Sequence, residues 1–251
     1  MILNKKYKFI YIHIPKSAGT FITRFCNKSI EGSKKINYDG DTHYGIFKAR
    51  NRLHNVPLNE YYKFMTVRNP WDWYVSLYEY VKKGNCHEWR LFSKHNNFKQ
   101  WLQQIANSRS TPATCNMFVN DKTSTATLYK HLHISNLDAG WLTHRYIYSC
   151  CIDWKEVFKS RTIESFQKDH DSIVLIDDVF KTETLAADFV DSITKHTDID
   201  PAIVNQIKSF KMQNVNKKRK ANYRDYYKDV KLVDLVAHKE RFLTERFNYE
   251  F

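Results

Sequence analysis

The chain has 251 residues, of which 42% are hydrophobic and 15% aromatic. This composition excludes a chain that is disordered throughout, and the length predicts a single domain over residues 1–251, with two small domains as the alternative. The 40 Lys and Arg exceed the 27 Asp and Glu, giving a formal charge of +13 that favours polyanionic partners.

No stretch of about 18 apolar residues occurs, so we expect no membrane span. The N-terminal sequence alternates apolar and polar residues and lacks a cleavage site, which indicates a strand and not a signal peptide. The cysteines are odd in number and show no CxxC spacing, which argues against a disulfide framework and against a zinc site. A cytoplasmic protein is therefore expected. The five cysteines are Cys26, Cys86, Cys115, Cys150 and Cys151.

Short apolar runs alternate with segments of helical spacing along the chain. Strands are predicted at 8–14, 62–68, 146–151 and 173–177. Helices are predicted at 19–28, 70–83, 98–106, 182–196, 201–210 and within 223–247. Such alternation is typical of an α/β domain in which helices flank a mainly parallel central sheet, giving three layers. Ligands of such sheets bind where strands end and helices begin.

The first predicted strand runs directly into a turn of small residues, Pro15-Lys16-Ser17-Ala18-Gly19-Thr20. Small side chains let backbone amides face an anion, and the helix that follows adds its unpaired N–H groups. Lys16 contributes a full charge, and Ser17 and Thr20 contribute hydroxyls. The turn therefore predicts a site for a phosphate-like anion, the alternative being an ordinary turn with an exposed lysine.

The turn is not the loop of the common nucleotide kinases. That loop, GxxxxGK[ST], places the lysine after its glycines and uses the next residue to hold magnesium. Here Lys16 precedes Gly19, and no obvious carboxylate partner for magnesium ends the next strand.

A second strand-to-helix turn follows about fifty residues later. Arg68 ends the predicted strand, Pro70 starts the predicted helix, and Ser76 lies near its second turn. A guanidinium can bind two oxygens of a phosphate monoester at once, and a hydroxyl can bind a third. The alternative is an ion pair of Arg68 with Asp72 at the start of the helix.

Together, IHIPKSAGT and FMTVRNPWDWYVSLYEY resemble the sulfotransferases that use 3′-phosphoadenosine 5′-phosphosulfate (PAPS). The resemblance is greatest to the carbohydrate sulfotransferase family that includes heparan sulfate 2-O-sulfotransferase. It is strong over about residues 8–30 and 60–82, fair over 208–251, which includes the C-terminal segment 223–251, and weak between these ranges. It implies a P-loop-like α/β fold and a soluble enzyme that needs no metal.

The resemblance also implies residue roles. Lys16 would contact the oxygen between the sulfuryl group and the 5′-phosphate. Pro15, Ser17, Ala18, Gly19 and Thr20 would form the rest of the phosphosulfate loop. Arg68 and Ser76 would hold the 3′-phosphate. A basic run would close over the nucleotide, unless it is only a solvated charge run; its members are Lys217, Lys218, Arg219 and Lys220. Relatives often carry Arg where this chain has Trp73.

Transfer to a hydroxyl needs a base that accepts the proton of the acceptor. His43 lies between the two phosphate motifs, where related carbohydrate enzymes have a histidine assigned as the base, and Asp41 could orient its ring. His144 is the second candidate, and His13 is expected to be a packed residue. The carboxylate alternatives are Glu60, Asp177 and Asp178, the last two predicted at a strand end.

The sequence thus predicts transfer of a sulfuryl group from PAPS to a hydroxyl or amine, with a saccharide as the expected acceptor and PAP as the product. Two other readings remain open: a kinase with an unusual phosphate loop, and a non-enzymatic binder of nucleic acid or acidic glycan. Nucleic acid is the less expected partner, because the basic residues are dispersed.

Overall fold

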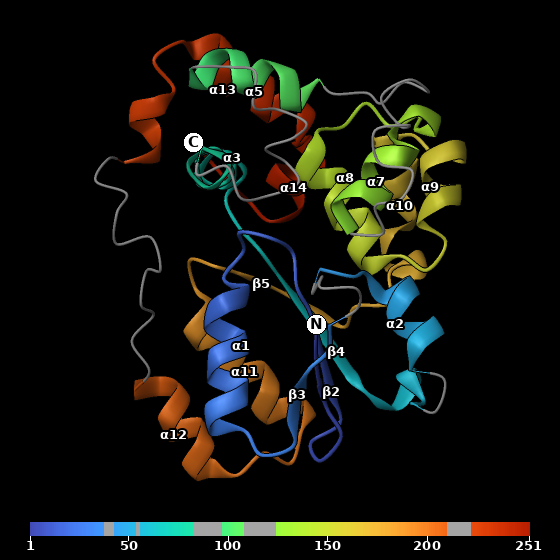
Figure 1. Cartoon of the computed structure of the whole chain (residues 1–251), viewed down its shortest axis with the longest axis vertical. Coiled ribbons are helices and arrows are strands. Elements are labelled where there is room, and N and C mark those ends of the chain that lie inside the picture. The colour runs from blue at the N-terminus through green and yellow to red at the C-terminus, as the bar shows by residue number, and fades with distance from the viewer. Residues whose placement is uncertain (38–42, 54–55, 83–96, 108–123, 210–221) are drawn as a thin grey trace. The chain divides into compact units, whose positions relative to one another are not determined.

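The computed structural model describes residues 1–37, 43–53, 56–82, 97–107, 124–209 and 222–251. The contacts within the chain cluster into two compact units. Unit 1 consists of Met1–Arg68 and Leu175–Arg219, and unit 2 consists of Asn69–Val174 and Lys220–Phe251. Figure 1 labels the elements of both.

Unit 1 contains a five-stranded sheet in the order β3-β1-β2-β4-β5. Its strands are β1 (Ile2–Asn4), β2 (Phe9–Ile12), β3 (Ser33–Lys35), β4 (Tyr62–Val67) and β5 (Asp178–Lys181). The β2–β4 and β4–β5 pairs are parallel, whereas β1 is antiparallel to both β2 and β3. The sheet is therefore mixed and not mainly parallel, because a tight turn at residues 5–8 returns β2 alongside β1.

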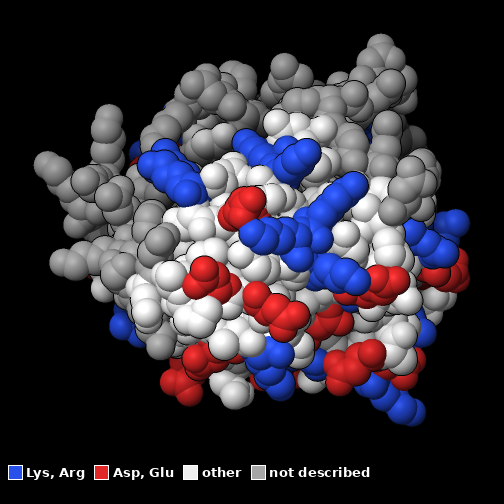
Figure 2. Space-filling view, turned by 90° about the horizontal axis from the view of Figure 1, so that it is seen from below, with Lys and Arg blue, Asp and Glu red and all other residues white. Residues whose placement is uncertain are grey.

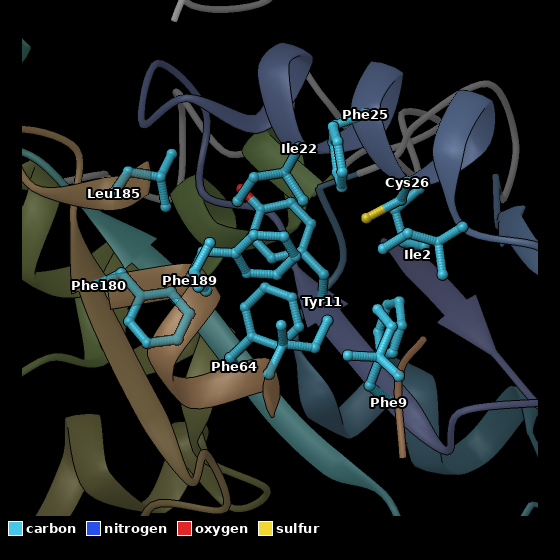
Figure 3. Close-up of a cluster of buried hydrophobic side chains, with 14 of the residues drawn as sticks. Ile2, Phe9, Tyr11, Ile22, Phe25, Cys26, Phe64, Phe180, Leu185 and Phe189 are labelled. Carbon is cyan, nitrogen blue, oxygen red and sulfur yellow. The ribbon is translucent and has the colours of Figure 1, made fainter. Parts of the chain in front are cut away.

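Helices α1 (Gly19–Ser29) and α11 (Leu185–His196) pack on one face of this sheet. Figure 3 shows the buried side chains between them, with Phe64 of β4 close to Phe189 of α11 at a ring-centroid distance of 5.4 Å. Aromatic pairs of this kind add to the hydrophobic stabilisation of a core. Unit 1 also contains α2 (Ile46–Arg52), the 3-10 helix η1 (Leu58–Glu60) and α12 (Pro201–Ser209). A second helical layer, and with it the P-loop-like three-layer arrangement, stays a prediction.

The described part of unit 2 is helical. Its α-helices are α3 (Pro70–Val81), α5 (Phe98–Ala106), α7 (Ser124–His131), α8 (Trp141–Cys150), α9 (Trp154–Ser160), α10 (Ile163–Ile173), α13 (Val230–Lys239) and α14 (Arg241–Arg246). Two 3-10 helices, η2 (Leu132–Ile134) and η3 (Tyr223–Tyr226), complete it. The start of α3 has Pro70 at its first position and Asn69 as a cap that accepts hydrogen bonds from two backbone amides.

Two predicted strands are wrong. Residues 146–150 belong to α8, and every residue of that helix is buried, so its sequence lacks the polar face by which an amphipathic helix is identified. Residue 173 ends α10, Val174 makes only an isolated bridge with Cys151, and the strand begins later, at Asp178.

The predicted helices at 19–28, 70–83 and 98–106 are confirmed within one or two residues. The helices at 182–196 and 201–210 are confirmed with slightly shorter bounds. The C-terminal segment forms η3, α13 and α14 and not one continuous helix. No helix in the described ranges is long and apolar enough to cross a membrane.

Candidate functional site

The loop between β2 and α1 has an unusual backbone. Lys16 has φ 66° and Ala18 has φ 56°, both in the left-handed region that non-glycine residues rarely adopt. The amide of Ser17 donates to the carbonyl of Ile14 at 3.3 Å, which tightens the turn. A backbone in which left-handed residues alternate in this way curls its amides toward a common centre, as anion-binding nests do.

The polar groups of this loop are not all used within the protein. The Ser17 side chain is fully buried, and its Oγ has no hydrogen-bond partner among the described residues. The backbone amides of Phe21 and Ile22 donate to the Ala18 carbonyl. Those of Gly19 and Thr20 have no acceptor among the described residues. A buried polar atom without a partner is costly in a native protein, so the Ser17 hydroxyl can contribute a hydrogen bond to a bound water or ligand.

Strand β4 is hydrogen-bonded to the loop between β2 and α1. The Thr66 hydroxyl donates to the carbonyl of Ser17, and the Tyr11 hydroxyl lies 2.9 Å from Thr66 Oγ1. Because the Thr66 proton goes to Ser17, the Tyr11 hydroxyl is the donor in the second bond. Both residues are fully buried, and burial raises the pKa of Tyr11 well above its usual value. A neutral Tyr11 therefore supports the loop at all ordinary pH values.

Arg68 follows β4 and reaches the same loop. Its Nη1 donates to the carbonyl of Lys16 at 3.3 Å. Since β2 and β4 are parallel, with Ile12 in register with Met65, their carboxyl ends lie at one edge of the sheet. The structure thus brings Lys16, Ser17 and Arg68 together, although the sequence motifs are about fifty residues apart.

Two histidines lie beside the loop. The rings of His13 and His43 are 4.4 Å apart between centroids, with an interplanar angle of 49°. A Cβ atom on Gly19 would overlap the His13 imidazole, so this ring packs directly against the start of α1. His43, the predicted base, is therefore in the same unit as the phosphate loop, and His13 is packed as expected.

The carboxylate alternatives for the base lie at or near the amino-terminal ends of strands β4 and β5, and not at the carboxyl ends. Asp178 is the first residue of β5 and pairs in register with Phe64, three residues before the carboxyl end of β4. Asp177 forms an ion pair of 2.9 Å with Lys63, and Glu60 forms one of 2.9 Å with Lys8. The expectation that Asp177 and Asp178 end a strand and point toward the reactive edge is wrong, because Asp177 precedes β5 and Asp178 is its first residue.

His144 has a different environment. It lies in α8 of unit 2 and is 5% exposed; its Nδ1 is 2.9 Å from the Gly140 carbonyl and its Nε2 is 2.9 Å from Ser135 Oγ. With both ring nitrogens in hydrogen bonds, His144 is a packed residue of this unit.

Ser76 is buried in α3 of unit 2, so its pairing with Arg68 at a 3′-phosphate stays a prediction from the sequence. The basic run Lys217, Lys218, Arg219 and Lys220 lies outside the described residues, as does Asp41. Sequence reasoning missed Thr66 and Tyr11. The sequence feature that could have identified Thr66 is its hydroxyl within an apolar strand, close to Arg68.

In the described ranges, no three His, Cys, Asp or Glu side chains are grouped as a metal site requires. A search of curated proteins and a search of solved structures each found no match to the chain. The sequence profile of the sulfotransferase family matches residues 1–234, which include both the β2–α1 loop and the Arg68 turn. The chain therefore belongs to the sulfotransferase family.

Proposed function

We propose that this sulfotransferase takes its sulfuryl group from PAPS and transfers it to a hydroxyl or amine, with a saccharide as the acceptor class. The observation that carries the proposal is the loop at residues 15–20, in which a buried Ser17 hydroxyl and the amides of Gly19 and Thr20 have no hydrogen-bond partner among the residues that the structure describes. Lys16 is part of this loop and Arg68 donates to its carbonyl, so both residues add positive charge to the loop.

The donor set fits a phosphosulfate group. Backbone amides at a helix start and a serine hydroxyl bind the oxygens of an anion, and the dipole of α1 favours negative charge at this end. When bound, PAPS supplies the sulfuryl group and a good leaving group. The protein has only to position and neutralise the reacting atoms.

Lys16 would act on the charge that develops during transfer. Its ammonium group would lie near the oxygen between sulfur and the 5′-phosphate, where negative charge grows as that bond breaks. A cation at this point stabilises the transition state more than the ground state, which is the condition for catalysis. Ser17, Gly19 and Thr20 would hold the 5′-phosphate oxygens in place through the same step.

His43 would accept the proton of the acceptor hydroxyl. A neutral imidazole is suited to this role near neutral pH, and its place beside the loop is compatible with an acceptor that attacks in line with the leaving oxygen. Arg68 and Ser76 are proposed to bind the 3′-phosphate. Lys217, Lys218 and Arg219 are proposed to close over the nucleotide.

The family match covers residues of both units, which supports one sulfotransferase domain over residues 1–251. The saccharide class rests on the resemblance to carbohydrate sulfotransferases and on the abundance of basic and aromatic residues, which bind acidic groups and sugar faces. Screening hydroxyl and amine acceptors with labelled PAPS tests this part of the proposal.

A thermal-shift experiment with PAP tests the nucleotide site. We expect PAP to raise the melting temperature in EDTA, without magnesium, because ligands that bind only the native state stabilise it. Lys16→Met should weaken this shift and abolish transfer. Lys28→Met is the matched control, because Lys28 is an exposed lysine at the other end of α1. No shift at millimolar PAP, or an equal effect of the two variants, contradicts the proposal.

If the protein is a kinase, ATP should stabilise it, and this stabilisation should depend on magnesium. If it is a polyanion-binding protein, its affinity should fall steeply with salt and show no preference among nucleotides. On the face shown in Figure 2, acidic side chains lie among the basic ones. Exposed ion pairs such as Lys6 with Glu31 and Lys8 with Glu60 also occur in the structure. This intermixing does not favour a continuous polyanion surface on that face.

A further inference from the structure

The imidazole of His13 is partly buried and packs against the start of α1. It follows Tyr11 on the same face of the strand, with ring centroids 6.0 Å apart and an interplanar angle of 25°. The backbone of Gly19 lies against the ring, and the ring of His43 lies 4.4 Å away. His13 thus stands between two rigid elements and the proposed base.

Gly19 shows how closely this ring is fitted. The residue is helical, so its backbone conformation does not itself require glycine. A Cβ atom at this position would overlap three atoms of the His13 imidazole. The missing side chain at the start of α1 is therefore explained by the space that the ring occupies.

The ring of His43 packs against that of His13. His43 precedes α2 and is not part of a helix or strand. Packing against a ring that β2 and α1 hold in place restricts the orientation of the His43 imidazole. A general base must be held to within a fraction of an ångström, and residues that support it through packing provide that precision.

We infer that His13 is a positioning residue of this sulfotransferase, which holds the imidazole of His43 in the orientation needed to accept the proton of the acceptor. The inference rests on the proposed function of His43. Proton transfer to His13 itself is the competing role, and the experiment below distinguishes the two.

The first measurement needs no acceptor. In protein with labelled histidine side chains, NMR reports the Cε1–Hε1 signals of the imidazoles as the pH is varied. His43→Asn identifies the His43 signal. We expect His13→Ala to shift that signal, because the ring current of the neighbouring imidazole is lost. We expect His13→Phe to leave the signal narrow, because an aromatic ring still packs against His43 and holds it in one orientation. A His43 signal that is the same in wild type and in His13→Ala overturns the inference.

The second measurement is the pH–rate profile of transfer from labelled PAPS to the best acceptor of the screen. His13→Ala should lower kcat by roughly 10- to 100-fold, the scale that misplacement of a catalytic group produces, and leave the KM for PAPS little changed. His13→Phe should recover most of the rate and keep the fall in rate at low pH that protonation of the base produces. If His13→Phe instead removes that fall as His43→Asn does, His13 is itself the base and the inference is wrong.

A double variant tests the fit with Gly19. Gly19→Ala alone should lower kcat, because the new methyl group displaces the His13 ring. In the His13→Ala background the same change should cost little, since the space is free and the two changes are coupled. Additive losses contradict the inference. Failure of wild-type protein to bind PAP or to transfer the label contradicts the proposed function, while the NMR measurement still decides whether His13 positions His43.

Discussion

Thr66 is a buried residue of β4 that is hydrogen-bonded to the loop at residues 15–20. Its hydroxyl donates to the Ser17 carbonyl and accepts from the Tyr11 hydroxyl, and all three residues are buried. The bond to Ser17 links the loop to β4, so the side chain contributes to both the fold and the site.

We predict that Thr66→Val destabilises the protein by about 1–3 kcal/mol, the cost of leaving buried polar groups without partners. It should also weaken PAP binding, because the Ser17 carbonyl is no longer held. Tyr11→Phe is the matched control, since it removes one hydroxyl and leaves the Thr66–Ser17 bond intact. Urea unfolding and PAP titration of both variants test this, and equal affinity for PAP in the two would contradict it.

At this scale the sequence offered candidates for the side chains that carry the chemistry, but it did not indicate the side chains that support them. Lys16, Arg68 and His43 follow from chemical type and from the resemblance to a family. Thr66, Tyr11 and Gly19 act by supporting the loop or leaving room for a ring. Such roles depend on contacts between distant segments, so they were not apparent from spacing along the chain.

Helix α8 in unit 2 has an N-terminus that is capped by a residue about a hundred positions away. The carboxylate of Glu240 accepts from the amides of Leu142 at 3.2 Å and Thr143 at 2.8 Å, and from the hydroxyls of Thr143 and Tyr74. Glu240 is fully buried, and burial raises its pKa to about 7. The cap therefore joins α3, α8 and the start of α14.

The raised pKa of Glu240 predicts how stability varies with pH. The folded protein binds this proton more tightly than the unfolded chain, whose value is about 4.3, so the contribution is fully present below that pH. It is lost as the pH rises toward and through about 7, with a slope of at most about 1.4 kcal/mol per pH unit. Glu240→Gln has no such proton, and its stability should vary less over this range.

Urea unfolding of wild type and Glu240→Gln between about pH 5 and pH 8 measures the difference. We expect Glu240→Gln to be less stable throughout, because an amide group cannot accept from all four donors. The difference in unfolding free energy should narrow as the pH rises. A difference that stays constant across this range would show that Glu240 does not titrate there.

The same cap predicts the effect of a methyl group at Gly140. A Cβ atom there would overlap the Glu240 carboxylate and lie 2.8 Å from the Tyr74 hydroxyl. Gly140→Ala should therefore destabilise the protein by about 1–3 kcal/mol, the usual cost of overpacking. In a Glu240→Ala background the cost should fall, and thermal unfolding of the two single variants and the double variant tests this coupling.

The errors in the predicted elements have two causes. The sequence of α8 contains β-branched and aromatic residues and is buried on all sides, so neither composition nor periodicity distinguishes it from a strand. Strand β5 is only four residues long and has one buried side chain, Phe180. Strand β5 is defined by its pairing with β4. A strand of four residues is too short to show a clear alternation of apolar and polar side chains.

At the scale of the whole molecule, the formal charge of +13 is compatible with both a nucleotide site and a polyanion surface. A nucleotide site and a polyanion surface differ in how strongly their affinity depends on salt. A surface that binds by general attraction loses affinity steeply with salt, in proportion to the number of phosphates contacted. A built site with a few aligned donors depends less on salt, because hydrogen bonds and neutral amides contribute to the binding.

We therefore predict a shallow salt dependence for PAP and a steep one for duplex DNA, measured by fluorescence titration between about 50 and 200 mM salt, where contacts to 6–10 phosphates cost about a thousandfold or more. Lys16→Met should weaken PAP binding strongly and DNA binding only slightly, because one lysine among many contributes little to general attraction. The exposed control Lys28→Met should affect neither strongly. If DNA binds more tightly than PAP at physiological salt, and if Lys16→Met and Lys28→Met weaken both ligands equally, the charge acts as a surface property and the loop at residues 15–20 is not the principal anion site.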